Sequence, residues 1–320
     1  MEPGFPVYAR DKLKRMDTRS TGFWDREVVE QAYQGWMTHP RVRHYINSSI
    51  SGSALHWPMD WFVSFLGGRT FRRGLSIGCG AGALERDLIR RGICEEIDAF
   101  DGSAGSIRVA QEEAAKAGYA EAIHYSVGDF NEPVLPRGAY DIVFAHQSLH
   151  HVAKLEKLFR AVLLAMKPDA LFYVDEYVGP SREQWNAASF AAHRALFEVI
   201  PEEHRLVSVL PLPIQVEDPS EAIRSNEILP ELRIGFDILE RHDYGGNLLA
   251  PIFPFIDMTD AIADSLITAE QELLSAGQES FYTVIVARPK RGAAASLANL
   301  RYFAVPKLKR VGRELRRSRT

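Results

Sequence analysis

The residues with the clearest chemical purpose lie in a glycine-rich turn in the first third of the chain. Gly78, Gly80 and Gly82 alternate directly after a short apolar run, 75–77, and before a stretch with helical periodicity, 84–91. Where a strand turns sharply into a helix, the free N–H groups of the helix N-terminus point at a ligand above the sheet. Glycine is needed there because a Cβ would block the turn or the approach of the ligand. The stretch therefore predicts a loop that binds a nucleotide cofactor.

Two ligand-binding interpretations fit this loop. Gly78-x-Gly80-x-x-Ala83 satisfies the dinucleotide fingerprint G-x-G-x-x-G/A, whereas Gly78-x-Gly80-x-Gly82 fits the looser loop of enzymes that use S-adenosylmethionine (SAM). A glycine-rich turn without any ligand is the third interpretation. Cys79 lies within the predicted cofactor-binding set, and we interpret it as a packing residue because a small side chain suffices there. Residues further along the chain must decide which cofactor is bound.

The first of these residues is Asp101, which ends the predicted strand 96–101 and lies 23 residues after Gly78. A carboxylate at the tip of that strand can accept hydrogen bonds from both ribose hydroxyls of an adenosine, in either cofactor family. Gly102 and Ser103 follow it and join the predicted cofactor site. The alternative is a solvated acid in a loop.

The two interpretations part at the next strand, 122–127, which is followed by Asp129 and Phe130. An acid directly after the third strand can accept a hydrogen bond from the adenine amino group, with an aromatic ring beside the base. This arrangement favours SAM over a dinucleotide.

Strands and helices alternate over most of the chain. The predicted strands are 75–77, 96–101, 122–127, 140–145, 170–175, 236–242 and 281–287, and the predicted helices are 84–91, 106–117, 154–166, 183–200, 220–229 and 258–276. Such alternation is typical of an α/β fold with a doubly wound parallel sheet and helices on both faces. Right-handed crossovers then bring the loops after the strands to one edge of the sheet.

The remaining segments suggest additions to this domain. We expect an N-terminal helical cap over residues 1–70, with helices at 25–37 and 57–66, a cofactor-binding domain over 71–290, and a basic tail over 291–320. Residues 176–235 break the alternation with several prolines, and we interpret them as an inserted lid.

Composition narrows the function classes. The 320 residues are 46% hydrophobic and 25% charged with a formal net charge of −4, and no apolar run approaches the ~18 residues of a membrane span. Two cysteines exclude a disulfide framework, and we expect a cytoplasmic protein.

The basic tail is a separate feature. The segment 288–320 holds eleven Lys or Arg and one acid, Glu314, so the rest of the chain is acidic and unsuited to nucleic acid. Three interpretations of the tail stay open: a solubilising end, a helix over 296–320 on an anionic membrane surface, or a partner contact.

With these motifs in order, the chain resembles the class I SAM-dependent methyltransferases. The resemblance covers roughly residues 70–290 and rests on the segments 75–82, Asp101, 128–130, 148–151 and the final strand pair. It departs at 167–170, Lys-Pro-Asp-Ala, where many members have glycines after the proline. It implies a seven-stranded Rossmann-like sheet, mostly parallel with an antiparallel last strand, and SAM as cofactor with S-adenosylhomocysteine (SAH) as product.

Further segments are similar to a bacterial subgroup that is associated with glycan or secondary-metabolite pathways. They are 176–180, 218–222 and 244–246. The implied acceptor is a small molecule or a sugar, and the oligomeric state stays open.

The resemblance also implies roles for individual residues. Gly78, Gly80 and Gly82 would shape the loop around the amino-acid part of SAM, and Asp101 would hold the ribose. In the same way, Asp129 and Phe130 would hold the adenine, while His146 and Gln147 would lie beside the sulfonium centre.

Methyl transfer from a sulfonium is an in-line displacement, so alignment alone can supply about 7–11 kcal/mol. A hydroxyl acceptor also profits from a general base, which typically adds about 10²–10⁴-fold. The candidates at the correct edge are His146, His150, His151, Glu176 and His242, of which we select Glu176 and His150. We expect no metal site, because two adjacent histidines cannot share one face of a helix.

The sequence therefore predicts methyl transfer from SAM to a small-molecule or sugar acceptor, at oxygen. An NAD-dependent oxidoreductase is the first alternative, but no Tyr-x-x-x-Lys or comparable pair lies near the fifth strand. A SAM-binding module without catalysis is the second alternative.

Overall fold

A computed structural model describes residues 35–291 and residue 302 of the chain. Its strands are β1 Phe71–Ile77, β2 Cys94–Asp101, β3 Ile123–Val127, β4 Tyr140–His146, β5 Met166–Tyr177, β6 Phe236–Asp243 and β7 Tyr282–Pro289. Its α-helices are α2 Pro40–Ser51, α3 Pro58–Leu66, α4 Ala83–Arg90, α5 Ala104–Lys116, α6 Leu155–Ala165, α7 Ala191–Val199, α8 Ile228–Gly235, α9 Leu249–Ile252 and α10 Asp260–Ser275. Each of the seven predicted strands is confirmed, with bounds that shift by a few residues.

The strands form one sheet in the order β3-β2-β1-β4-β5-β7-β6. Neighbours among the first five pair in parallel, and β7 runs antiparallel to both β5 and β6. The predicted fold class, a doubly wound seven-stranded sheet with an antiparallel last strand, is confirmed. Because β1, β2, β3, β4 and β5 run in one direction, the loops that follow them meet at one edge.

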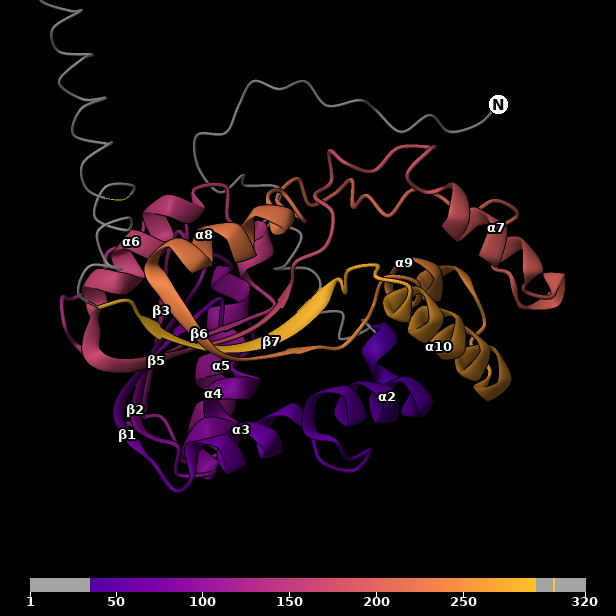
Figure 1. Ribbon diagram of the computed structural model, residues 1–320. Coiled ribbons are helices and arrows are strands. Elements are labelled where there is room, and N and C mark those ends of the chain that lie inside the picture. Colours follow the sequence, from indigo (N-terminus) through magenta and orange to yellow (C-terminus); the bar gives the residue numbers. More distant parts are fainter. Residues whose placement is uncertain (1–34, 292–301, 303–320) are drawn as a thin grey trace, which may run out of the picture.

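Side chains on the central strands alternate between two apolar cores, as the pleat requires. Val143 and Ala145 of β4 pack into one core with α6 and α8, whereas Ile142 and Phe144 pack into the other core with α2, α3, α4 and α5. Figure 1 shows α6 and α8 over one face of the sheet, with α3 and α2 beyond the opposite face.

The structure adds a helix that the sequence analysis missed in the predicted cap. Helix α2 covers Pro40–Ser51, which we had expected to lie between helices. Pro40 occupies the first helical turn, where its missing N–H costs nothing, and Gly52 ends the helix in a left-handed conformation. The three aliphatic side chains at positions 42, 46 and 50 are buried at helical spacing. The polar run 47–49 had hidden this pattern. The predicted helix at 25–37 falls largely outside the described residues.

The predicted helix 183–200 is wrong in its first half, because α7 begins only at Ala191. The side chain of Asn186 accepts hydrogen bonds from the backbone N–H groups of Ala188 and Ser189. Local side-chain bonds of this kind satisfy the backbone in a turn and compete with a helix.

The predicted helix 220–229 is also wrong, since residues 225–227 form a 3-10 turn and α8 begins at Ile228. Ala222 has a φ of 50°, a left-handed conformation that no helix tolerates. Helix α8 packs on α6, so the last part of the predicted lid belongs to the layer on that face of the sheet. Whether the rest acts as a lid, and the boundaries 1–70 and 71–290, stay predictions.

Within the described ranges 35–291 and 302, no helix has both the length and the apolar character needed to cross a membrane. The predicted tail helix over 296–320 falls almost entirely outside these ranges.

Candidate functional site

The glycine loop between β1 and α4 is bent as predicted, with positive φ angles of 73°, 50° and 77° at Gly78, Gly80 and Gly82. Two of these glycines are required by packing. A Cβ on Gly78 would lie 2.2 Å from the Cβ of Ser148, and one on Gly82 would lie 2.3 Å from the hydroxyl oxygen of Tyr125. Gly80 differs, because a Cβ there would meet nothing within 4 Å. The loop therefore turns its middle glycine toward open space.

Asp101, at the tip of β2, is bonded directly to this loop. Its carboxylate accepts hydrogen bonds from the backbone N–H of Gly80 at 3.0 Å and of Ser103 at 2.8 Å. The Ser103 side chain in turn caps α5 by accepting the N–H of Ser106. The structure thus brings Gly80, Asp101, Gly102 and Ser103 together, at the ends of neighbouring strands.

Asp129 lies beside this group, because β3 pairs with β2 and the N–H of Gly128 donates to the carbonyl oxygen of Asp101 at 2.9 Å. One carboxylate oxygen of Asp129 accepts the N–H of Asn131 at 2.7 Å. Phe130 is only 3% exposed and packs against Phe100, with ring centroids 5.7 Å apart. Its ring therefore supports the site from within the core.

Cys79 is buried in the loop. Burial raises the pKa of its thiol far above the usual value, and the charges of Glu85 and Asp101 add to the effect. The thiol is therefore neutral, in keeping with a packing residue.

The turn after β4 is the second part of the site. Gln147 has a φ of 52°, a strained value for a residue with a side chain. The hydroxyl of Ser148 donates to the carbonyl oxygen of Ile77 at 2.7 Å, so this turn is tied to the start of the glycine loop.

Glu176, at the end of β5, is hydrogen-bonded to the same turn. Its carboxylate accepts the backbone N–H groups of Ser148, Leu149 and Tyr177 at 2.8, 2.6 and 2.7 Å. It also accepts a hydrogen bond from Nδ1 of His150, and Glu176 itself is 0% exposed. We had expected Glu176 to face an acceptor, but this geometry favours a positioning role.

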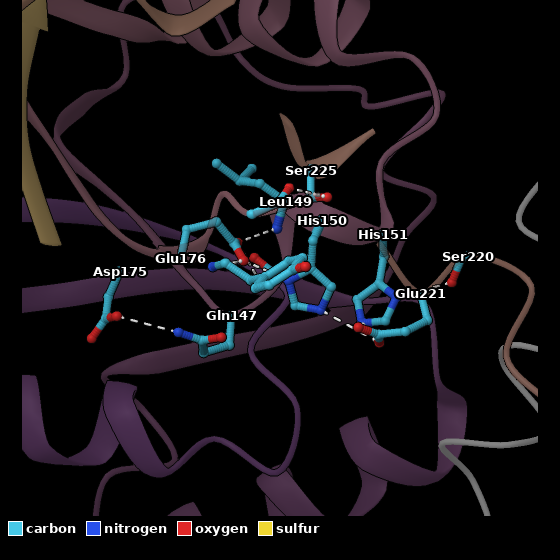
Figure 2. A network of polar contacts seen from close by, with 12 residues as sticks. Gln147, Leu149, His150, His151, Asp175, Glu176, Ser220, Glu221 and Ser225 are labelled. Atoms are coloured by element: carbon cyan, nitrogen blue, oxygen red, sulfur yellow. Dashed lines mark hydrogen bonds and ion pairs between the residues drawn. The ribbon is translucent and has the colours of Figure 1, made fainter. Parts of the chain in front are cut away.

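His150 and His151 lie in the 3-10 turn Leu149–His151, with ring centroids 4.1 Å apart. The two adjacent rings therefore lie side by side, contrary to the prediction, because they are on a 3-10 turn and not on an α-helix. Nε2 of His150 and Nε2 of His151 lie 3.6 and 3.7 Å from the same Glu221 oxygen (Figure 2). Burial lowers the pKa of His150, but Glu176 and Glu221 outweigh it and hold the pKa well above its usual value.

A second imidazole lies at the same edge. His146 has 49% of its side chain exposed, and its Nε2 lies 3.5 Å from a carboxylate oxygen of the buried Asp175. The other Asp175 oxygen accepts hydrogen bonds from the Tyr244 hydroxyl at 2.5 Å and from the Gln147 side chain at 3.2 Å. Burial raises the pKa of Asp175, and these bonds partly oppose the rise. By contrast, His242 packs edge-on against Trp61.

Several residues of this edge were missing from the predicted site. They are Asp175, Asp218, Ser220, Glu221 and Tyr244. Asp175 precedes Glu176 at the end of a predicted strand, which was a usable signal. The segments that hold the others were noticed only for their resemblance to a subgroup, and nothing in their spacing placed them beside β4.

Comparisons with known proteins agree with this geometry. Residues 75–174 match a family model described as a methyltransferase domain. The chain is 35% identical over 100 residues to a ubiquinone biosynthesis O-methyltransferase of Methylobacterium nodulans, covering 31% of this chain and 38% of that protein. It is 25% identical over 226 residues to a sterol 24-C-methyltransferase of Saccharomyces cerevisiae, covering 69% of this chain and 54% of that protein. The matches thus span about two fifths to one half of the length of these relatives.

Among solved structures, the fold is similar to a geranyl diphosphate C-methyltransferase of Streptomyces coelicolor, solved with Mg²⁺, geranyl diphosphate and SAH. The TM-score is 0.52 at 15% identity, and the alignment covers 87% of this chain and 100% of that chain. At this identity the likeness concerns the fold alone.

The strand order, the glycine loop and the family model define the class. Residues 75–174 are a methyltransferase domain of the class I, SAM-dependent type. The methyl donor of this class is SAM and the product is SAH, so the choice between the two interpretations of the loop falls on SAM.

Proposed function

We propose that this chain transfers a methyl group from SAM to a small-molecule acceptor at the edge formed by the glycine loop and the β4 turn. The observation that carries the proposal is the position of Gly80, whose open side adjoins Asp101. A second acid, Asp129, follows at the next strand tip. Such a cradle fits an adenosyl group, because glycine admits the ligand and carboxylates accept from hydroxyl and amino groups.

The cofactor-binding residues follow from this placement. Gly78, Cys79, Gly80 and Gly82 would face the amino-acid part of SAM, while Asp101, Gly102 and Ser103 would hold the ribose. Asp129 would accept from the adenine, with Phe130 as a buried support. His146 and Gln147 would lie beside the sulfonium.

When bound, SAM supplies an activated methyl group, so the protein must chiefly align the acceptor and remove its proton. His146 suits the second task, because its imidazole is half exposed and the Asp175 carboxylate lies behind it. A carboxylate fixes the orientation of an imidazole and stabilises the cation that forms when the base takes a proton. We therefore assign the base to His146, with Glu176 and His150 as positioning residues of the same turn.

We further propose an oxygen acceptor on a small molecule or sugar. A hydroxyl must lose a proton during transfer, and the paired imidazole and carboxylate at this edge provide for that loss. One relative is named as an O-methyltransferase and another as a C-methyltransferase, so the names of relatives leave the acceptor atom open.

Calorimetry with SAH tests the proposal, and the chain offers a matched control. Gly80→Ala and Gly118→Ala both place a Cβ where φ is positive and where nothing lies within 4 Å. Each should cost about 1–2 kcal/mol of backbone strain. Only Gly80→Ala should weaken SAH binding, by about tenfold or more, because its Cβ enters the cofactor space.

Equal SAH affinity in both variants would contradict the cofactor site. SAH binding by the wild type without SAH release from SAM, with every acceptor offered, would leave a SAM-binding module instead of an enzyme.

A further inference from the structure

We propose that His150, His151 and Glu221 bind a divalent transition metal ion of the zinc type. The three residues come from the β4 turn and from the segment 218–225, which are far apart in the sequence (Figure 2). One ligand atom from each of them lies within 4.8 Å of the others. Two imidazoles and one carboxylate are a ligand set that zinc uses in catalytic sites.

The direction of the rings supports the proposal. Both imidazoles turn Nε2 toward one Glu221 oxygen, at 3.6 and 3.7 Å. Ligand atoms about 2.0–2.2 Å from a tetrahedral ion are separated by roughly 3.3–3.6 Å. Small side-chain rotations would therefore suffice to close the site around an ion.

The opposite nitrogen of each ring is held in the way that metal-bound histidines require. Nδ1 of His150 donates to Glu176, which fixes its ring. Nδ1 of His151 lies 3.0 Å from the Ser220 hydroxyl and 3.4 Å from Asp218, and that hydroxyl donates to Asp218 at 2.7 Å. Such outer carboxylates hold the ring proton on Nδ1, so that the neutral imidazole presents the lone pair of Nε2 to an ion. A surface salt bridge has no need for this second layer.

The charges of the described residues around this site also favour a bound cation. Glu176 and Asp218 are 0% exposed, and Glu221 has 33% of its side chain exposed. Arg182 is a cation that also acts on Glu221, in addition to the two histidines. An ion that binds Nε2 of His150 displaces the proton of that ring, so both imidazoles would be neutral in the loaded site. The charges of Glu176, Asp218, Glu221 and Arg182 then sum to −2, which a divalent cation would balance.

The bound ion would have a structural consequence. The segment that carries Glu221 already meets the β4 turn, because the N–H of Ile223 donates to the carbonyl oxygen of His150 at 3.0 Å. The ion would lock this segment onto the turn. Three protein ligands also leave one position for water or for an oxygen of the acceptor.

The test uses the full chain, treated with a chelator and then titrated with Zn²⁺ by calorimetry and with Co²⁺ by visible absorption. We expect one ion per chain and the absorption bands of a tetrahedral cobalt site. Glu221→Gln and His151→Gln should each weaken binding at least 100-fold, and Asp218→Asn about 10–100-fold. His124→Gln, which changes an exposed histidine on β3, is the matched control and should leave the titration unchanged.

SAH binding and thermal unfolding of each variant show whether it is folded. Failure of the wild type to take up about one ion per chain would overturn the metal site and leave His150 as a proton-bearing link between two carboxylates. Unchanged ion binding in a folded Glu221→Gln variant would overturn it as well. Either result is separate from the cofactor site, since SAH binding depends on the glycine loop.

Discussion

Two buried glutamates hold turns at the carboxyl edge of the sheet in nearly the same way. Glu176 accepts the N–H groups of Ser148, Leu149 and Tyr177. Glu270, on α10, accepts those of residues 246, 248 and 249 at 2.8, 2.8 and 3.1 Å. Both side chains are 0% exposed. The same device, a carboxylate under a turn, is therefore used twice.

The two regions differ in the last partner of each carboxylate. The last partner of Glu270 is the phenol of Tyr45, which is hydrogen-bonded to the carboxylate and does not titrate near neutral pH. The last partner of Glu176 is the imidazole of His150, whose other ring nitrogen forms an ion pair with Glu221. The comparison teaches that a buried carboxylate first fixes a turn, and that chemistry becomes available only where the turn also carries titratable side chains.

The largest expected effect is the loss of either carboxylate. Glu176→Ala and Glu270→Ala each leave three backbone N–H groups, most of them buried, without an acceptor, so each should lower the free energy of unfolding by about 3–5 kcal/mol. Urea denaturation measures the change. A loss below about 1 kcal/mol for either variant would mean that the turn is stable without the carboxylate.

The second expected effect separates the two turns by activity. His146→Gln removes an imidazole from the turn held by Glu176, and turnover should fall by about 100-fold or more. His193→Gln is the matched change beside the other turn: His193 lies on α7 and contacts the carbonyl oxygen of Asn247 at 2.7 Å. It should leave turnover within about threefold. SAH release with an acceptor that supports turnover gives the comparison, and similar losses in both variants would remove the distinction.

A third buried glutamate, Glu85, differs from the other two because it should make the stability of the protein depend on pH. Glu85 on α4 bonds to the Ser76 hydroxyl, and burial raises its pKa to about 6. The folded protein then holds the proton more tightly than the unfolded chain. Stability is therefore lost as the pH rises from about 4.5 through 6, by about 2 kcal/mol in total.

Glu85→Gln lacks this titration. Relative to the variant, the wild type should become less stable between pH 4.5 and 7, as measured by denaturation at several pH values. A difference that does not change with pH would show that the pKa of Glu85 is the same in the folded and the unfolded chain.

The smallest expected effect concerns the phenol that ends the Glu270 network. Tyr45→Phe removes one hydrogen bond to a carboxylate that keeps its three N–H donors, so it should cost about 1–2 kcal/mol. Thermal unfolding measures the loss. A cost as large as that of Glu270→Ala would mean that the phenol, and not the backbone, holds the carboxylate.

The sheet and the glycine loop could be predicted because their signals are local. The run 75–77 is short and apolar, and Gly78, Gly80 and Gly82 mark the turn that follows. Asp101 could be placed as well, because an acid at the end of a parallel strand must lie at the ligand edge.

The cluster around His150 could not be predicted in the same way. Its members come from the turn after β4, from β5 and from the segment 218–225, and contacts between residues so far apart in the sequence leave no periodicity. The left-handed Ala222 and the side-chain bonds of Asn186 show why the intervening helices were misjudged. At Asn186 side-chain hydrogen bonds to the backbone outweighed helical spacing, and at Ala222 the left-handed backbone interrupted the helix.

The most direct test of the account is a crystal structure of the full chain with SAH. We predict that the adenosyl group lies over Gly80, with the ribose hydroxyls on Asp101 and the adenine near Asp129. The sulfur should face His146 and Gln147. SAH bound elsewhere, or bound over Gly80 with its sulfur directed away from the β4 turn, would contradict the proposed site of methyl transfer.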